Sequence, residues 1–126
     1  WAPFQFEIGN RALYAIDHPD FHVLSLEDPL VPVEVGFIRR LSNIGLFGLR
    51  VDRNTVIAHN HRGLFFIDVR DPTQPEPIGY HAIPSEFESF EVQNKVAYVA
   101  AAGSGVQVFG PCRSIATRSA GGRIHP

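Results

Sequence analysis

Short apolar stretches, each about the length of a β-strand, alternate with polar turns along the chain. Clear examples are residues 12–16, 21–26, 64–69 and 96–100. They are rich in β-branched and aromatic residues and are bounded by Asn, Asp, Gly or Pro, as strands usually are. Several are apolar on both faces, which suits a sheet covered on both sides. Ten prolines and eleven glycines interrupt the chain too often for long helices, so the pattern predicts an all-β protein.

An internal repeat is the strongest signal in the sequence. Residues 28–36, DPLVPVEVG, recur 43 positions later as residues 71–79, DPTQPEPIG. A third copy begins with NKVAYVA at residues 94–100, which aligns with NRALYAI at residues 10–16. A complete unit of about 40 to 50 residues with four strands is typical of a β-propeller blade. In the middle copy we expect these strands at residues 45–51, 55–60, 64–69 and 77–83.

The repeat divides residues 1–110 into about three four-stranded antiparallel blades, at residues 1–41, 42–84 and 85–110. Propeller rings have at least about four blades, so this chain alone is not expected to close one. The end blades then expose apolar faces, which further blades of the same protein, a second copy or another protein subunit would cover. We favour a longer parent protein, because the chain begins at Trp1 and contains no methionine.

The repeat ends near residue 110. Residues 111–126 are small, basic and non-periodic, and we expect them to form a flexible basic tail. The third blade therefore has no recognisable fourth strand in the sequence.

The middle copy also carries a family resemblance. The sequence IDVRDP at residues 67–72, followed by a proline and a glycine in the repeat register, resembles the LVIVD repeat. A weaker copy, LSLEDP, occupies residues 24–29. The resemblance covers residues 4–110 and implies a β-propeller in an extracellular, periplasmic or cell-surface setting, because LVIVD domains belong to exported or surface-associated proteins. It implies a fold and not a chemistry, since propellers carry many unrelated activities.

Composition narrows the possible functions. Eleven basic and thirteen acidic side chains give a net charge of −2, too balanced for electrostatic binding of nucleic acid or anionic membranes. No apolar run approaches the roughly 18 to 20 residues of a membrane-spanning helix. The single cysteine, Cys112, excludes an internal disulfide framework. We interpret Cys112 as incidental, the alternative being a tether to a partner in an oxidising compartment.

Four residues near strand ends are the candidate metal ligands. His59 and His61 lie two positions apart on one strand and therefore point to the same face. His18 holds the position of His61 in the preceding blade, with Asp20 close by. Imidazole and carboxylate groups together suit Zn²⁺. However, no standard ligand spacing is present, so we interpret these residues as turn or hydrogen-bonding groups and predict neither a metal nor another cofactor.

Carboxylates offer a weaker case for chemistry. Glu86, Glu88 and Glu91 form the most acidic run, but alternation places Glu86 and Glu88 on one face, where they are typical of a solvated strand edge. Asp28 and Asp71 are explained by the turns that they begin. We therefore predict no catalytic residue.

The remaining candidates are partner contacts. Arg39 and Arg40 follow Phe37, and arginine beside aromatic side chains is common in the energetic centres of protein interfaces. A well-kept structural repeat without a recurring reactive cluster favours a non-catalytic protein-binding or scaffolding module. Such a module would be part of an exported or surface-associated propeller, or an accessory subunit of a larger complex. The alternative is a propeller enzyme, a hydrolase or a metal-dependent oxidoreductase, with the histidines named above at the ring centre.

Overall fold

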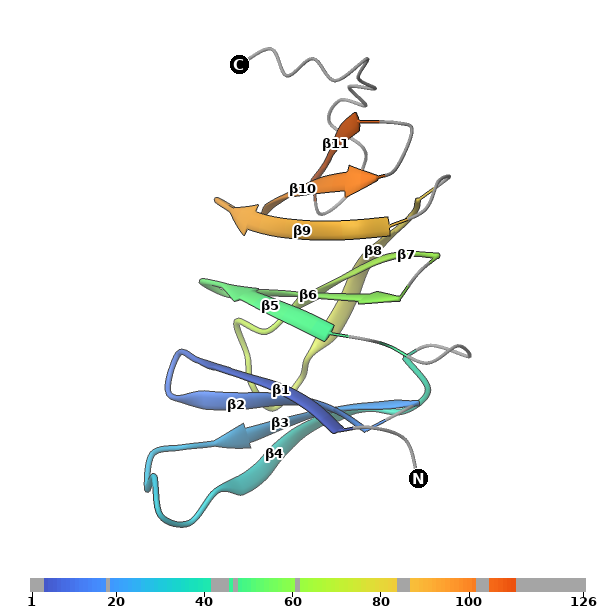
Figure 1. Cartoon of the computed structure of the whole chain (residues 1–126). Coiled ribbons are helices and arrows are strands. Elements are labelled where there is room, and N and C mark those ends of the chain that lie inside the picture. The colour runs from blue at the N-terminus through green and yellow to red at the C-terminus, as the bar shows by residue number, and fades with distance from the viewer. Residues whose placement is uncertain are drawn as a thin grey trace.

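Within the described residues, the computed structural model contains eleven β-strands in three separate antiparallel sheets (Figure 1). The structure describes residues 4–17, 19–41, 46, 48–60, 62–83, 87–101 and 105–110. No helix occurs in these ranges, and hence none that is long and apolar enough to cross a membrane. The predicted all-β fold is confirmed.

The first sheet has the order β1-β2-β3-β4, so each strand pairs with the next one in the chain. Its strands are β1 (Phe4–Gly9), β2 (Ala12–Asp17), β3 (Asp20–Ser25) and β4 (Val33–Ile38). Asn10 and Arg11 connect β1 to β2 with φ angles of 53° and 58°. Two successive left-handed residues are the geometry of a tight hairpin turn whose twist matches that of the strands.

The second sheet repeats this arrangement with the order β5-β6-β7-β8. Its strands are β5 (Gly48–Asp52), β6 (Thr55–Asn60), β7 (Gly63–Asp68) and β8 (Glu76–Ala82). The third sheet consists of β9 (Phe87–Gln93), β10 (Val96–Ala101) and β11 (Gly105–Phe109). The predicted tail, residues 111–126, lies outside the described residues.

The repeat in the sequence is also a repeat in hydrogen-bond register. Each of the first two sheets has an irregularity between its third and fourth strands, at Val23/Leu24 and again at Phe66/Ile67. The Asp-Pro turns match as well. Asp28 Oδ1 accepts from the Leu30 N–H at 3.1 Å, and Asp71 Oδ1 accepts from the Thr73 N–H at 3.0 Å. Both aspartates therefore hold turns together, as the sequence predicts.

Two apolar layers join the three sheets. The layer between the first and second sheets includes Tyr14, Phe21, Val23, Leu49, Val56 and Ile67. The layer between the second and third sheets includes Ile57, Leu64, Phe66, Phe90, Val99 and Phe109. Since β6 and β7 supply side chains to both layers, the second sheet is covered on both faces, which explains its continuous apolar strands.

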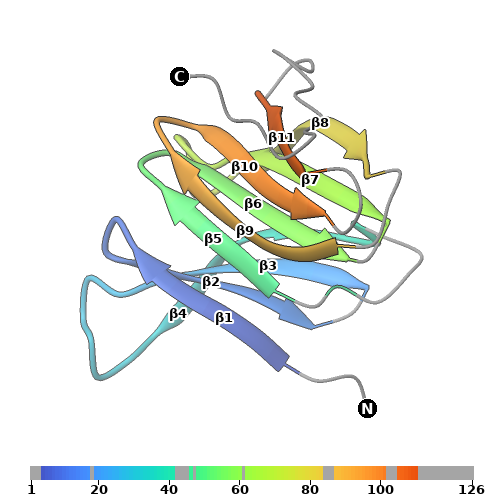
Figure 2. The same ribbon diagram turned by 45° about the horizontal axis from the view of Figure 1, so that its top comes forward.

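The first strands of the sheets, β1, β5 and β9, lie side by side (Figures 1 and 2). In a propeller the innermost strand of each blade lies next to the ring axis, and the remaining strands follow outward. The chain therefore forms about three antiparallel blades, and these do not close into a ring.

Candidate functional site

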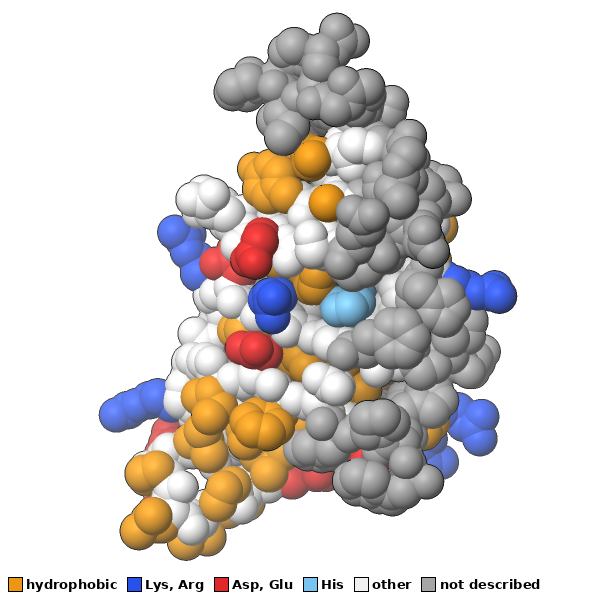
Figure 3. Space-filling model, in the orientation of Figure 1, with side chains coloured by type: hydrophobic (Ala, Val, Ile, Leu, Met, Phe, Trp, Pro, Cys, Tyr) orange, Lys and Arg blue, Asp and Glu red, His pale blue; other side chains and the backbone are white. Residues whose placement is uncertain are grey.

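At one equivalent position of the three inner strands, β1, β5 and β9, the charge of the side chain alternates from sheet to sheet. Glu7, Arg50 and Glu91 occupy equivalent positions, opposite Tyr14, Ile57 and Tyr98 on the neighbouring strands. Arg50 Nη1 lies 3.9 Å from Glu7 Oε2, and the guanidinium lies 5.7 Å from the centre of the Phe90 ring. Figure 3 shows acidic and basic side chains alternating on this face of the molecule. Because both side chains are partly exposed, the ion pair contributes little to the free energy of unfolding.

The hairpin turns of successive blades are connected by hydrogen bonds. Asn10 Nδ2 donates to the Arg53 carbonyl, and the Lys95 N–H donates to the Asp52 carboxylate. Both bonds connect one β-hairpin turn to the corresponding turn of the next sheet. They fix the alignment of the sheets along the edge that carries the β1–β2, β5–β6 and β9–β10 turns, which we call the hairpin rim.

The Asp-Pro segment of the second blade packs on the outer strand of the first. A Cβ atom at Gly36 would lie 2.0 Å from the Pro72 carbonyl oxygen and 2.9 Å from Pro75 Cδ. No side chain fits in that space, which explains why glycine occupies this position of the repeat. The equivalent residue on β8 is Gly79.

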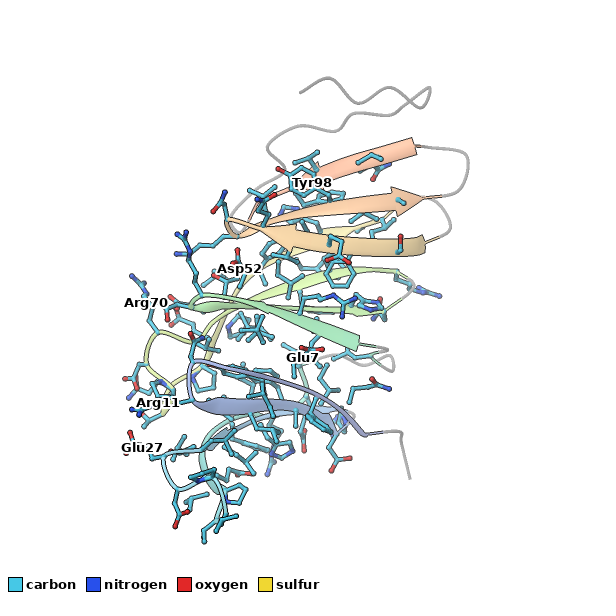
Figure 4. All side chains as sticks on the ribbon, turned by 60° about the vertical axis from the view of Figure 1, so that its left-hand side comes forward. Glu7, Arg11, Glu27, Asp52, Arg70 and Tyr98 are labelled. Carbon is cyan, nitrogen blue, oxygen red and sulfur yellow. The ribbon has the colours of Figure 1, made fainter. Side chains whose placement is uncertain are left out.

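A cleft of about 430 Å³ opens between the first two sheets at the same rim. Charged and polar groups line it, among them Asn10, Arg11, Tyr14, Glu27, Asn54 and Arg70. Figure 4 shows Arg11, Glu27 and Arg70 at this rim.

Three titratable groups in or near the cleft have shifted pKa values that favour their ordinary charge states: Tyr14 in its lining, and Asp68 and Asp71 next to the lining residues Arg70 and Pro72. Burial raises the pKa of Tyr14, although a hydrogen bond from Asn10 partly opposes this effect. The backbone N–H and guanidinium of Arg70 lower the pKa of Asp68, and hydrogen bonds from Thr73 lower that of Asp71. At neutral pH the phenol is therefore protonated and both carboxylates are ionised. None of the three is poised for proton transfer, which needs a pKa near the working pH.

The four candidate metal ligands are only partly described. His18 and His61 lie outside the described residues, while Asp20 lies in the first sheet and His59 in the second. Asp20 Oδ1 accepts from the Arg40 N–H at 2.9 Å. In the described ranges, no group of three or more His, Cys, Asp or Glu side chains is arranged to hold a metal ion.

His59 faces the third sheet, where its ring centre lies 4.8 Å from that of Phe90 in an edge-on contact. Burial and, to a smaller extent, the nearby Arg50 charge together lower the pKa of His59 to about 4. The imidazole is therefore neutral at pH 7 and packs as an aromatic side chain.

The candidate partner contacts lie on and beyond β4. Phe37 is exposed, with its ring centre 5.1 Å from that of His22. Arg39 and Arg40 are exposed in the turn that follows, and Arg40 has a φ angle of 55°. The acidic run is divided, since Glu91 is exposed on β9 while Glu86 lies outside the described part of the chain, as does Cys112.

The structure adds an exposed apolar corner that the sequence analysis did not select. Leu30 is 90% exposed and Val31 is 56% exposed in the β3–β4 turn, and Val33 beside them is also exposed. In the second blade the same positions hold Thr73, Gln74 and Glu76. A comparison of the two copies, position by position, would have found this difference.

Comparisons with known proteins support the fold. Neither a family model nor a curated protein matches the chain. The computationally designed protein Ika8 is 12% identical, with a TM-score of 0.67, and the match covers 91% of this chain and 37% of Ika8. The N-terminal domain of Nup159 is 8% identical, with a TM-score of 0.62, and the match covers 94% of this chain and 33% of that domain.

A third match is to a Saccharomyces cerevisiae complex in which Dbp5 is bound to Nup159, Gle1, IP6 and ADP. It has 7% identity and a TM-score of 0.58, and it covers 92% of this chain and 33% of the matched chain. The chain thus spans about a third of the length of the structures that it resembles. The Nup159 domain is a propeller. At these identities the likeness concerns the fold alone.

Proposed function

We propose that the chain is a non-catalytic protein-binding module of a β-propeller, in which the rigid blades present loops to a partner protein. The propeller fold supports such a role, and the neighbouring complex that contains Nup159 and Dbp5 is an example of protein association among its structural relatives. The observation that carries the proposal is the exposed apolar corner formed by Leu30, Val31 and Val33.

Blade packing does not account for this corner. The turn of the second blade packs on the first sheet through Pro72 and Pro75, yet Thr73 and Gln74 remain exposed. A blade placed before the first sheet would therefore leave Leu30 and Val31 exposed in the same way. Exposed aliphatic side chains at positions that the sister blade fills with polar residues are typical of an interaction site.

We also propose that Phe37, Arg39 and Arg40 extend the contact surface along β4. Aromatic and arginine side chains contribute strongly when an interface desolvates them. The corner lies before β4 and the arginines lie after it, so one partner would follow the length of this outer strand.

An exported or surface-associated setting, in which the chain belongs to a larger propeller or serves as an accessory subunit, is part of the same proposal. Its support is the resemblance of residues 67–72 to the LVIVD repeat. Secretion of the parent protein, followed by immunodetection outside the cytoplasm, would test it.

Comparison of two matched variants tests the binding function. Val31 and Gln74 occupy equivalent positions in the two Asp-Pro turns. The Val31 N–H donates to the backbone carbonyl of Asp28 at 3.0 Å, and the Gln74 N–H donates to that of Asp71 at 2.9 Å. The immobilised wild-type chain, Val31→Asp and Gln74→Asp are each incubated with an extract of the source cells, and the bound proteins are quantified. We expect a partner that wild type and Gln74→Asp retain and that Val31→Asp loses at least about tenfold. Identical profiles for the two variants would contradict the proposal.

A further inference from the structure

The cleft at the hairpin rim is built entirely from the first two sheets, both of which have four strands. Arg11, Tyr14 and Glu27 belong to the wall of the first sheet, and Arg70 and Pro72 belong to the wall of the second. Its volume of about 430 Å³ lies within the range of roughly 300 to 1,000 Å³ that is typical of pockets for small organic ligands. The cleft is therefore large enough for a ligand and needs no further blade to form it.

Two charged side chains of the lining are available to a ligand. Within the described part of the chain, Arg11 and Glu27 form no ion pair, whereas Arg70 Nη2 lies 2.9 Å from Asp68 Oδ2. The N–H of Leu26 donates to the Arg11 carbonyl at 2.9 Å, which places the next residue, Glu27, beside Arg11. Figure 4 shows both residues at the hairpin rim. A guanidinium and a carboxylate thus occupy neighbouring positions at the edge of the cleft.

Tyr14 adds a hydrogen-bond donor inside the cleft. The residue is only 1% exposed, and its hydroxyl oxygen accepts from Asn10 Nδ2 at 3.3 Å. The hydroxyl proton has no acceptor among the residues that the structure describes. Since a buried donor without an acceptor costs free energy, an oxygen atom of a ligand in the cleft would be stabilised there.

Blade packing does not require these three groups. Ile57 holds the position of Tyr14 in the second blade and is fully buried against the third sheet, so an aliphatic side chain is sufficient for the contact between sheets. All three positions differ between the two blades: Asn54 replaces Arg11, Ile57 replaces Tyr14 and Arg70 replaces Glu27. The cation, the anion and the phenol therefore distinguish this cleft from the contact between the second and third sheets.

We propose that the cleft binds a short apolar peptide whose ammonium and carboxylate termini are both free. Arg11 pairs with the carboxylate, Glu27 pairs with the ammonium group, and Tyr14 donates to a ligand oxygen. A ligand with a single charge is repelled by one of the two side chains, whereas a zwitterion is attracted by both. The apolar part of the lining covers the side chains of the peptide, and it consists of Ala12, Val35, Val69 and Pro72.

A titration with three related dipeptides tests the proposal. The ¹⁵N-labelled chain is titrated at low salt with L-leucyl-L-leucine, with its N-acetyl derivative and with its C-terminal amide, and amide chemical shifts are followed. The N-acetyl derivative lacks the ammonium group, and the amide lacks the carboxylate. The unmodified dipeptide should bind at least about fivefold more tightly than either derivative, with shifts centred on Asn54 and Val69.

Charge variants show which residue recognises which terminus. Arg11→Gln should bind the dipeptide and its amide equally, because the variant no longer attracts the carboxylate. Glu27→Gln should bind the dipeptide and its N-acetyl derivative equally, because the variant no longer attracts the ammonium group. Arg62→Gln is the control, since Arg62 lies in the β6–β7 turn at the other end of β6 and should keep both preferences. A cleft variant that also keeps both preferences would overturn the assignment.

The role of the hydroxyl is tested by Tyr14→Phe, which keeps the ring and removes the donor. We expect several-fold weaker binding of the dipeptide by this variant. Tyr98→Phe removes the hydroxyl of the equivalent residue in the third sheet and should bind as wild type does. Equal affinities of the two variants would exclude Tyr14 as a donor to the ligand.

Two results with the wild-type chain would overturn the proposal. One is the absence of saturable shifts at about 10 mM dipeptide, which is far above the dissociation constant of a specific site. The other is equally tight binding of all three dipeptides. The exposed corner at Val31 is separate from the cleft, so Val31→Asp should bind the dipeptide normally, and failure of the protein-binding function would leave this result unchanged.

Discussion

At the scale of single residues, Gly36 shows how closely successive blades approach. Its backbone lies under the Pro72 carbonyl, and an added Cβ would stand 2.0 Å from that oxygen. Gly36→Ala should therefore push the Asp-Pro segment off β4 and lower the free energy of unfolding by at least about 2 kcal/mol. Urea titration followed by circular dichroism measures the change.

Gly9→Ala is the matched control for that substitution. Its added Cβ would meet Val51 Cγ1 at 2.9 Å, which is a side-chain atom and not a backbone oxygen. A side chain can rotate away, so the loss should be clearly smaller than at Gly36. Equal losses at the two glycines would contradict the interpretation that the Pro72 backbone limits position 36.

The stability of the chain should also vary with pH, because of the partly buried residue His59. Its pKa is lowered to about 4 in the folded chain, against an ordinary value of 6.5, chiefly because burial disfavours the charged imidazole. Between these two values the unfolded chain binds the additional proton, so stability is fully present above about pH 6.5 and falls as the pH decreases toward 4. Allowing for partial exposure, we expect a loss of about 1–2 kcal/mol.

Urea titrations at pH 7 and pH 4.5 test this dependence. The carboxylates also titrate near the lower pH, so the informative quantity is the difference between wild type and His59→Gln, which keeps a neutral polar side chain. The variant should lose less stability between the two pH values than wild type. The same loss in both proteins would show that His59 does not control it.

At the scale of the structural elements, the role of Asn10 in the connection between hairpin turns can be tested by comparison with the equivalent residue, Asn94. Asn10 and Asn94 have the same φ angle of 53°, so replacement by alanine costs both turns the same backbone strain. Asn10 also donates to the carbonyl of Arg53 in the next sheet and, at 3.3 Å, to the Tyr14 hydroxyl. Asn10→Ala should therefore be less stable than Asn94→Ala by at least about 1 kcal/mol. Equal unfolding midpoints of the two variants in urea would argue against a stabilising role for these hydrogen bonds.

Most strands of this fold are predictable from the sequence, because each copy of the repeat contains the apolar runs and turn residues that form them. In the middle blade, the expected strands at residues 55–60 and 64–69 lie within one residue of β6 and β7. The expected strand at residues 45–51 begins three residues before β5, which spans Gly48–Asp52. It also ends one residue too early, because the β5–β6 turn occupies only two residues and Asp52 still belongs to the strand. The repeat period, the apolar runs and the turn residues can each be recognised within a short segment of sequence, so they predict the strands well.

The site was less predictable, because it depends on which side chains different blades bring together. The hydrogen bond from Asn10 to Arg53, the contact of Pro72 with Gly36, and the charge pair of Glu7 with Arg50 all join successive blades. No single-blade pattern contains them. The exposure of Leu30 likewise follows from the position of its turn beyond the packed layers.

At the scale of the whole molecule, the three sheets differ in how many faces are covered. The second sheet packs on both sides, whereas the first and third each pack on one side in the single chain. Stability in a stacked array is approximately the sum of the stability of each unit and that of its contacts with neighbours. The second sheet should therefore be the most stable part of the molecule.

Amide hydrogen exchange tests this order. Protection should be greatest in β6 and β7 and lower in β2 and β10, because local opening of the first or third sheet disrupts one apolar layer and opening of the second disrupts two. Equal protection of β2, β6 and β10 would show that coverage on both faces does not set the local stability of the second sheet.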